Sequence, residues 1–342
     1  MREESRARTF AGVVAGVLML GVLLGCGVEE GPDKTTDPVL IYSGRSEALV
    51  GGLLEIFEEE TGVEVQVRYG STTEMAATLL EEGAHTPADV FLSQDAAALG
   101  AVSRAGLFRE LNDEILSRVP ERFRSPSGEW VGVSGRARTI VYNTERVSLG
   151  ELPRSLQEVG DSRFRGRFGV APTNGSFQAH MAVFRALHGA EALDALLAAM
   201  ARNEPGRYPK NSAIVEAVIA GEVDWGLVNH YYLWRARKET PAAVAENYFF
   251  PVGEASGFVN TAGAGVLSER AEAHRLVAFL VSETAQSYFA RETFEYPLAG
   301  GVDPAVELPP LTEVASASVD FGEVSAVFEE TLAAIAASGL VQ

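Results

Sequence analysis

Residues 39–69 read VLIYSGRSEALVGGLLEIFEEETGVEVQVRY and contain a strand, a helix and a second strand in turn. The apolar run 39–42 predicts the first strand, which Ser43-Gly44 breaks. Apolar residues then recur at helical spacing from Leu49 to Phe57, and Thr61-Gly62 predicts the helix end. Valines that alternate with polar residues over 63–69 predict the second strand.

The same alternation continues beyond residue 69. Ser71, with Glu74 three residues later, is typical of a capping box and predicts a second helix. The buried run 88–92 predicts a third strand, and a third helix is expected over 95–105. This β-α-β-α-β order predicts a largely parallel sheet with helices on both faces.

A second α/β unit is predicted over 140–260. Its strands are expected near 138–142, 168–171 and 223–228, and its helices after 176, over 193–200, over 214–220 and from Asn229. Another strand at 264–267, a long helix over 271–289 and an amphipathic helix over 324–337 follow. Ligands bind beyond the carboxyl ends of such strands, so two doubly wound lobes predict a site in the cleft between them.

The N-terminus has the pattern of a secretory signal peptide. The first ten residues carry three arginines, and an uncharged apolar run extends over 10–24. This run is shorter than the roughly 20 residues that span a bilayer. The alternative, a membrane-anchoring helix, is less favoured because Leu23-Leu24-Gly25-Cys26 resembles the bacterial lipobox, in which the cysteine is acylated and the chain is cut before it.

We therefore expect a signal peptide at 1–25 and a lipid on Cys26. Cys26 is the only cysteine in 342 residues, so no internal disulfide can form. Residues 26–38 are polar and rich in Gly, Pro and acidic residues, which predicts a flexible lipidated tether. The expected location is extracytoplasmic and membrane-anchored, either in the periplasm or on the outer face of the cytoplasmic membrane.

The charge of the chain excludes one class of partner. The formal net charge is −19 at pH 7. A chain this acidic is not expected to bind nucleic acid. Most of the acidic excess is ordinary surface solvation, although it could also attract cations.

Asn229-His230-Tyr231-Tyr232 is the most informative segment, because it follows a predicted strand at a helix start. Adjacent tyrosines often pack in a core, and that interpretation stays open for either one. However, adjacent helical positions point about 100° apart, so both rarely enter one core. A trivalent cation would deprotonate a phenol, as metals do to other ligands.

Phenolate is a hard oxygen donor that suits Fe(III) better than Zn(II). A single cysteine rules out a cysteine cluster, and the five histidines show no ligand spacing. We expect His230 to be a polar neighbour of the tyrosines rather than a ligand. Tyr142, Arg45 and the segment Thr173-Asn174-Gly175-Ser176 also stand at strand ends, and the last could cradle an anion at a helix start. Equally good interpretations are that Tyr142 is a core residue, that Arg45 is a surface charge and that the segment 173–176 is a plain turn with a helix cap.

Taken together, these segments resemble the periplasmic ferric-ion-binding proteins of ABC transporters. The resemblance runs from about residue 40 to 301 and rests on VLIYSGRSE, TPADVFLSQD, VGVSGRARTIVYNT, GRFGVAPTNGSF, YPKNSAIVEAVIAGEVDWGLVNHYYLWR and EYPLAGG. GLVNHYY is its most specific part. The resemblance implies a two-lobed periplasmic-binding-protein fold of the class II type, with two strands crossing between the lobes. It implies an N-lobe of 39–136 plus 262–300 and a C-lobe of 137–261 plus 301–342.

The resemblance also implies the ligand set. Some members use a histidine and a glutamate where this chain has Ser46 and Gln94, so the chain is similar to a three-tyrosine subgroup, with Fe(III) held by Tyr142, Tyr231 and Tyr232. That subgroup adds a small anion such as carbonate, and a guanidinium suits a planar oxyanion. The candidate anion ligands are Arg45, Ser46, Arg138, Asn174, Gly175, Ser176, Asn211 and Asn229.

The implied function is Fe(III) capture and delivery to an ABC permease and its ATPase, by a monomer without catalytic activity. The main alternative is the same scaffold binding an organic solute, such as a polyamine, thiamine or a phosphonate, and Asp95 would suit a polyamine. An enzyme is disfavoured because no Ser/His/Asp or Cys/His motif stands out. A ligand sensor for a membrane receptor stays open.

Overall fold

The structure is a computed structural model that describes residues 37–251, 256–314 and 321–341. The predicted signal peptide (1–25), Cys26 and nearly all of the predicted tether lie outside these residues. Pro38–Gln342 forms one compact unit. Within its described part, no helix has both the length and the apolar character that a membrane span needs.

The first part of the chain follows the predicted alternation of strands and helices. Two predicted helix ends are confirmed: Gly62 adopts a left-handed φ of 69° after the first helix, and Ser71 and Glu74 form the capping box of the second. The elements are β1 (Val39–Ser43), α1 (Glu47–Thr61), β2 (Val65–Tyr69), α2 (Thr72–Glu82), β3 (Val90–Ser93), α3 (Ala96–Arg104) and α4 (Asp113–Leu116).

The next part begins with a strand longer than predicted. Only 138–142 was expected, but the strand covers 14 residues, all of them buried, so its sequence lacks the alternation that marks a strand with one exposed face. The elements are β4 (Trp130–Asn143), β5 (Phe168–Val170), α5 (Gly175–His188), α6 (Ala190–Arg202), β6 (Gly206–Arg207), α7 (Asn211–Ile219), β7 (Trp225–Asn229), α8 (Tyr231–Glu239) and β8 (Ala245–Tyr248).

The last part returns through a long strand and ends in short helices. The predicted helix over 271–289 is divided, because the Ser282 side chain accepts the Ala285 N–H and caps a new helix. The predicted helix over 324–337 is likewise two helices. The elements are β9 (Val259–Val266), α9 (Ala271–Leu280), α10 (Glu283–Tyr288), a π-helical turn (Phe289–Thr293), β10 (Tyr296–Pro297), α11 (Leu311–Val314), α12 (Phe321–Ala326) and α13 (Phe328–Ala337).

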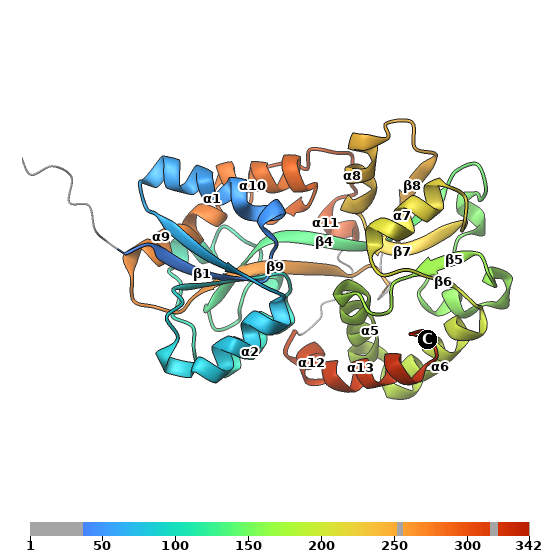
Figure 1. The fold of residues 1–342 in the computed structure, drawn as a ribbon, viewed down its shortest axis with the longest axis horizontal. Coiled ribbons are helices and arrows are strands. Elements are labelled where there is room, and N and C mark those ends of the chain that lie inside the picture. The colour runs from blue at the N-terminus through green and yellow to red at the C-terminus, as the bar shows by residue number, and fades with distance from the viewer. Residues whose placement is uncertain (1–36, 252–255, 315–320, 342) are drawn as a thin grey trace, which may run out of the picture. The chain divides into compact units, whose positions relative to one another are not determined.

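The strands of the described residues form one mixed sheet in the order β2-β1-β3-β9-β4-β7-β5-β6. The outer pairs, β1 with β2 and β3 and β5 with β6 and β7, are parallel as predicted. The central pairs, β3–β9, β9–β4 and β4–β7, are antiparallel. Because β4 pairs with β9 along its first half and with β7 and β8 along its second, it runs through both lobes (Figure 1).

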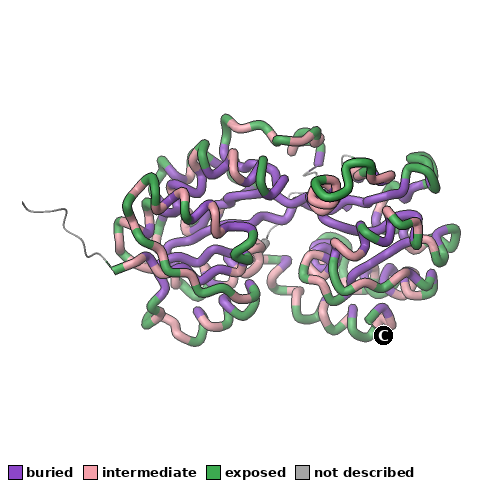
Figure 2. Tube along the Cα trace, turned by 45° about the horizontal axis from the view of Figure 1, so that its top comes forward, coloured by how far each residue is buried: buried purple, intermediate pink, exposed green. Residues whose placement is uncertain are grey.

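Each half of the sheet is buried between helices (Figure 2). On the β1 side, Ile41 packs with α1 and α9, and Tyr42 packs with α2 and α3. On the β7 side, Leu227 packs with α5 and α6, and Val228 packs with α7. The lobe bounds stay a prediction. Val314 of α11 falls within the predicted C-lobe, yet it packs in the same core as Val39, which falls within the predicted N-lobe.

Candidate metal centre

Two tyrosines stand where β7 ends and α8 begins. The strand stops at Asn229, His230 caps the helix, and Tyr231 and Tyr232 are its first two residues. Their rings stack with centroids 4.4 Å apart and an interplanar angle of 29°. Tyr231 is 2% exposed, and both tyrosines line a cleft of about 260 Å³.

The phenol of Tyr232 favours its neutral form when no cation is bound. Burial raises the pKa of Tyr232 far above its usual range, and the adjacent Tyr231 raises it further. A phenol in this state becomes a ligand only when a metal displaces its proton. Tyr232 can therefore become a phenolate ligand for a highly charged cation by losing its proton.

Arg138 lies beside the tyrosines and organises a polar cradle. It stands opposite Asn229 in the β4–β7 pairing. Its Nη1 donates to Asn211 Oδ1 and Asn229 Oδ1, both at 3.0 Å, and to Ser176 Oγ at 3.3 Å. Burial lowers the pKa of Arg138 to about 9, so it remains a cation at neutral pH.

The cradle continues at the start of α5. Asn174 caps this helix by accepting the Ser176 N–H at 3.1 Å, and it also accepts the Ser176 hydroxyl at 2.5 Å. Asn211 Nδ2 donates to Asn174 Oδ1 at 2.9 Å and to Ser176 Oγ at 3.0 Å. Among the described residues, Arg138 Nε and Nη2 find no hydrogen-bond partner. Buried donors of this kind beside a helix N-terminus suit an oxyanion.

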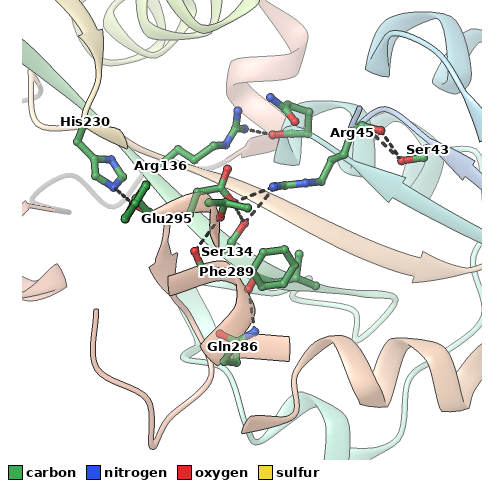
Figure 3. Close-up of polar contacts among 12 residues, drawn as sticks. Ser43, Arg45, Ser134, Arg136, His230, Gln286, Phe289 and Glu295 are labelled. Carbon is green, nitrogen blue, oxygen red and sulfur yellow. Dashed lines mark hydrogen bonds and ion pairs between the residues drawn. The ribbon is translucent and has the colours of Figure 1, made fainter. Parts of the chain in front are cut away.

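The opposite wall of the cleft is formed by the loop between β3 and α3 and by Arg136 of β4. Arg136, 2% exposed, reaches from β4 and donates through Nη2 to the Gln94 carbonyl oxygen (Figure 3). Asp95 accepts the Ala98 N–H at 2.9 Å as the cap of α3. Burial raises the pKa of Asp95, and the Ala98 N–H and Arg136 oppose that rise. The full lining is Gly44, Ser71, Thr72, Thr73, Gln94, Asp95, Arg136, Asn174, Gly175, Ser176, Asn229, Tyr231, Tyr232 and Asn260.

The structure brings together most of the predicted site residues. Of the predicted metal ligands, Tyr231 and Tyr232 line the cleft, as do the predicted anion ligands Asn174, Gly175, Ser176 and Asn229. Arg138 and Asn211 stand directly behind them in the same hydrogen-bond network.

Tyr142 does not join this group. It is 8% exposed and packs in a hydrophobic core with Phe168 of β5 and Trp225 of β7. It is paired with Trp225, at the opposite end of β7 from Asn229. It lies four residues further along the strand than Arg138, a distance of about 13 Å. Its side chain therefore supports the core rather than the cleft.

Arg45 and Ser46 do not line the cleft either. Arg45 is fully buried, and its Nη2 pairs with Glu295 Oε2 at 2.8 Å while its Nη1 donates to Ser134 at 3.1 Å (Figure 3). Ser46 is exposed and precedes α1. The first loop thus supplies an internal ion pair in place of the predicted anion ligands.

His230 is a structural neighbour of the tyrosines, as expected. Its Nδ1 accepts the Ala137 N–H at 3.1 Å, and its Nε2 lies 2.9 Å from the Phe294 carbonyl oxygen (Figure 3). The tautomer protonated at Nε2 satisfies both contacts. With both ring nitrogens used, His230 is not free to bind a metal.

Sequence reasoning missed Arg136, Asn260 and the start of α2 at Ser71–Thr73. The signal was present, since α2 begins at the carboxyl end of β2, where ligands bind in such sheets. Among the described residues, no group of three or more His, Cys, Asp or Glu side chains could hold a metal. The cleft lining offers the oxygens of the adjacent Tyr231 and Tyr232 as hard donors, with the Asp95 carboxyl on the other wall.

Comparison with known proteins gives a consistent family. Residues 85–321 match the family described as bacterial extracellular solute-binding protein. The chain is 30% identical to the Fe(3+)-binding periplasmic protein of Serratia marcescens, over 84% of this chain and 86% of that protein. It is 37% identical to iron uptake protein A1 of Synechocystis sp., over 77% and 76% of the two chains.

The fold has a close structural counterpart. Iron-bound HitA from Pseudomonas aeruginosa superposes with a TM-score of 0.81 at 29% identity, covering 88% of this chain and 99% of that one. The two-lobed periplasmic-binding-protein fold predicted from the sequence is thereby confirmed.

Proposed function

Because this chain belongs to the bacterial extracellular solute-binding proteins, among the periplasmic ferric-ion-binding proteins, we propose that it binds Fe(III) through Tyr231 and Tyr232. Its relatives are solute-binding transport proteins, and the chain is accordingly not an enzyme. The observation that carries the proposal is the stacked tyrosine pair at the N-terminus of α8, beside the hydrogen-bond network of Arg138.

An anion completes the proposed site. The cradle of Arg138, Asn211 and the α5 N-terminus offers N–H donors and positive charge next to the phenols. Carbonate is the simplest anion that fits such a planar fork. It would offset the charge of Arg138 and bridge the protein to the metal.

We further propose that the loaded protein delivers iron to an ABC permease and its ATPase. A monomer tethered through lipidated Cys26 would stay close to the permease, because a tether raises the effective concentration. Closure of the two lobes about β4 and β9 would enclose the ion, in the way that hinged binding proteins do.

An organic cation is a poorer ligand for this cleft. A polyamine would need carboxylates, and Asp95 is the acidic residue among the lining side chains. Arg136 lines the same wall, and Arg138 lies behind the opposite wall. These two guanidinium groups would repel a polycation.

Visible absorption tests the proposal directly. Fe(III) added with bicarbonate to the purified protein should produce a phenolate-to-iron charge-transfer band, and Tyr231→Phe should remove most of it. Tyr248→Phe, which alters a tyrosine outside the cleft, is the matched control and should keep the band. A colourless wild-type protein whose thermal stability rises with putrescine instead would refute iron binding.

A further inference from the structure

His230 connects the tyrosine pair to two distant segments of the chain. It lies between the last residue of β7 and the first residue of α8, and it is fully buried. Its backbone N–H donates to the Ala137 carbonyl oxygen at 3.0 Å, and its Nδ1 accepts the Ala137 N–H at 3.1 Å. Its Nε2 lies 2.9 Å from the Phe294 carbonyl oxygen (Figure 3). One residue therefore joins the start of α8 both to β4 and to the segment before β10.

The ring of His230 also contacts the ring of Tyr231. The two ring planes meet at 88° with their centroids 5.7 Å apart, which is an edge-to-face arrangement. His230 is likewise tilted by 49° against the ring of Tyr296, with centroids 5.0 Å apart. Tyr231 in turn stacks on Tyr232. A chain of ring contacts thus leads from β10 to the cleft, and the position of the imidazole restricts the position of the first phenol.

Phe294 presents its carbonyl to His230 from a conformation that phenylalanine rarely adopts. Its φ of 57° and ψ of 25° lie in the left-handed region. The side chain is 8% exposed, and Lys238 of α8 places Nζ 4.9 Å from the centroid of its ring. The next residue, Glu295, is held by its buried ion pair with Arg45. A non-glycine residue keeps such a conformation only where its surroundings impose it, and residues of this kind cluster at functional sites.

Packing alone does not call for a histidine at position 230. An apolar side chain could fill a buried space without any hydrogen-bond partner, whereas both nitrogens of a buried imidazole must be satisfied. Here Nδ1 accepts from Ala137 and Nε2 donates to Phe294, so the ring is neutral and has one tautomer. Two backbone groups from separate segments therefore fix the orientation of the imidazole.

We propose that His230 is a positioning residue of the metal site, which fixes the ring of Tyr231 so that its phenol oxygen stays directed at the cleft. This inference rests on the proposed function, and His230 itself does not touch the metal. Phe294 falls within the predicted N-lobe and Tyr231 within the predicted C-lobe. The bond between His230 and Phe294 therefore makes the orientation of the ligand depend on the placement of the lobes.

The two nitrogens of the imidazole contribute unequally to this role. The backbone N–H of His230 bonds to Ala137 whatever the side chain is, so the link to β4 survives the loss of Nδ1. The bond to Phe294 is made by Nε2. We therefore expect the loss of Nε2 to disturb Tyr231 more than the loss of Nδ1.

The test measures the affinity for iron and the position of the charge-transfer band. The full chain in detergent is titrated with Fe(III) in the presence of bicarbonate. His230→Leu should lower the affinity about 10–100-fold, as is typical when a group that orients a metal ligand is removed. It should also shift the maximum of the band, because the energy of the transition depends on how the phenolate meets the iron.

Two conservative variants separate the nitrogens. His230→Gln, whose amide nitrogen can take the place of Nε2, should recover most of the affinity that His230→Leu loses. His230→Asn, whose amide oxygen can replace Nδ1 but which does not reach Phe294, should remain weak. This comparison decides the proposal even if His230→Leu does not fold.

Leu197→Ala is the matched control for the loss of a buried side chain. Leu197 of α6 is 1% exposed, packs in the core that contains Leu227 of β7, and does not line the cleft. Its truncation should destabilise the metal-free protein in urea. The affinity for iron and the maximum of the band should nevertheless stay those of the wild type.

The possible failures are distinct. No band in the wild type would overturn the proposed function itself. A wild-type affinity and band maximum in His230→Asn would overturn only the positioning role of His230. Equal losses of affinity in His230→Gln, His230→Asn and Leu197→Ala would overturn it as well, because they would assign the effect to a general loss of stability.

Discussion

Arg45 and Glu295, 250 residues apart in sequence, form an ion pair of 2.8 Å in which both side chains are fully inaccessible to solvent. Burial alone would raise the pKa of Glu295, but Arg45, Arg136 and Ser134 hold it below its usual range. The guanidinium of Arg45 also lies over the Phe289 ring at 5.4 Å. The ion pair links the loop after β1, which contains Arg45, to the segment after the π-helical turn, which contains Glu295.

Glu295→Ala should therefore destabilise the protein strongly. Removing one partner leaves a buried, uncompensated charge, which costs about 3–5 kcal/mol of unfolding free energy. Urea unfolding measures this loss. Glu292→Ala is the control, because its pair with Lys238 at 3.6 Å is exposed and such pairs contribute about 0–1 kcal/mol. Equal losses in the two variants would contradict the assignment of the buried pair.

Tyr142→Phe should leave the charge-transfer band of the iron-loaded protein unchanged. Its ring packs with Phe168 and Trp225, away from the cleft, and phenylalanine preserves that packing. The comparison is Tyr232→Phe, which should weaken the band and speed iron release. A weakened band in Tyr142→Phe would restore this residue to the ligand set.

Iron binding should release protons and weaken in acid. The pKa of Tyr232 is raised in the metal-free protein, so the phenol is protonated at neutral pH and must lose its proton to bind. Falling pH opposes that loss, and affinity at fixed free Fe(III) should drop up to about tenfold per pH unit for each phenol. A pH indicator in weak buffer should count about one proton fewer on iron binding to Tyr232→Phe than to wild type. An unchanged count would contradict phenolate coordination.

The protein should lose stability between neutral pH and pH 5 through His180. This residue is fully buried, with Nε2 at 3.1 Å from the Ser256 carbonyl oxygen, and burial followed by the charge of Arg138 lowers its pKa to about 3. The unfolded chain binds a proton near pH 6.5 and the native chain does not. Stability therefore falls as pH drops below that value, by about 2 kcal/mol at pH 5.

His180→Gln provides the check, since the amide can still donate to Ser256 and does not titrate. Its unfolding free energy should depend less steeply on pH than that of wild type over pH 5–7. Parallel curves for the two proteins would exclude His180 as the source.

Local signals in the sequence predicted many helix and strand boundaries, because such boundaries depend on residues that are close together in the chain. The Ser71–Glu74 capping box and the end of α1 at Gly62 are of this kind. The break at Ser282 was missed, since apolar spacing continues across it while the capping side chain interrupts the helix.

Only part of the site was predicted, because some of its contacts join residues that are far apart in sequence. The tyrosine pair was found because it adjoins the end of a strand that has a clear apolar pattern. Tyr142 was assigned as a ligand from the resemblance to a three-tyrosine subgroup, and that resemblance does not show which end of the 14-residue strand reaches the cleft. The role of Arg45 depends on Glu295, and no local pattern links two residues that far apart in sequence.

The antiparallel pairing of β3 with β9 also sets an order of events during synthesis. Ser93 pairs with Gly263, so roughly 170 residues must be made after β3 before its partner exists. At about 5–20 residues per second, this wait is on the order of ten to thirty seconds. For that time the backbone N–H and C=O groups along one edge of β3 have no partner strand, and the sheet on the β1 side is complete only after β9 has been synthesised.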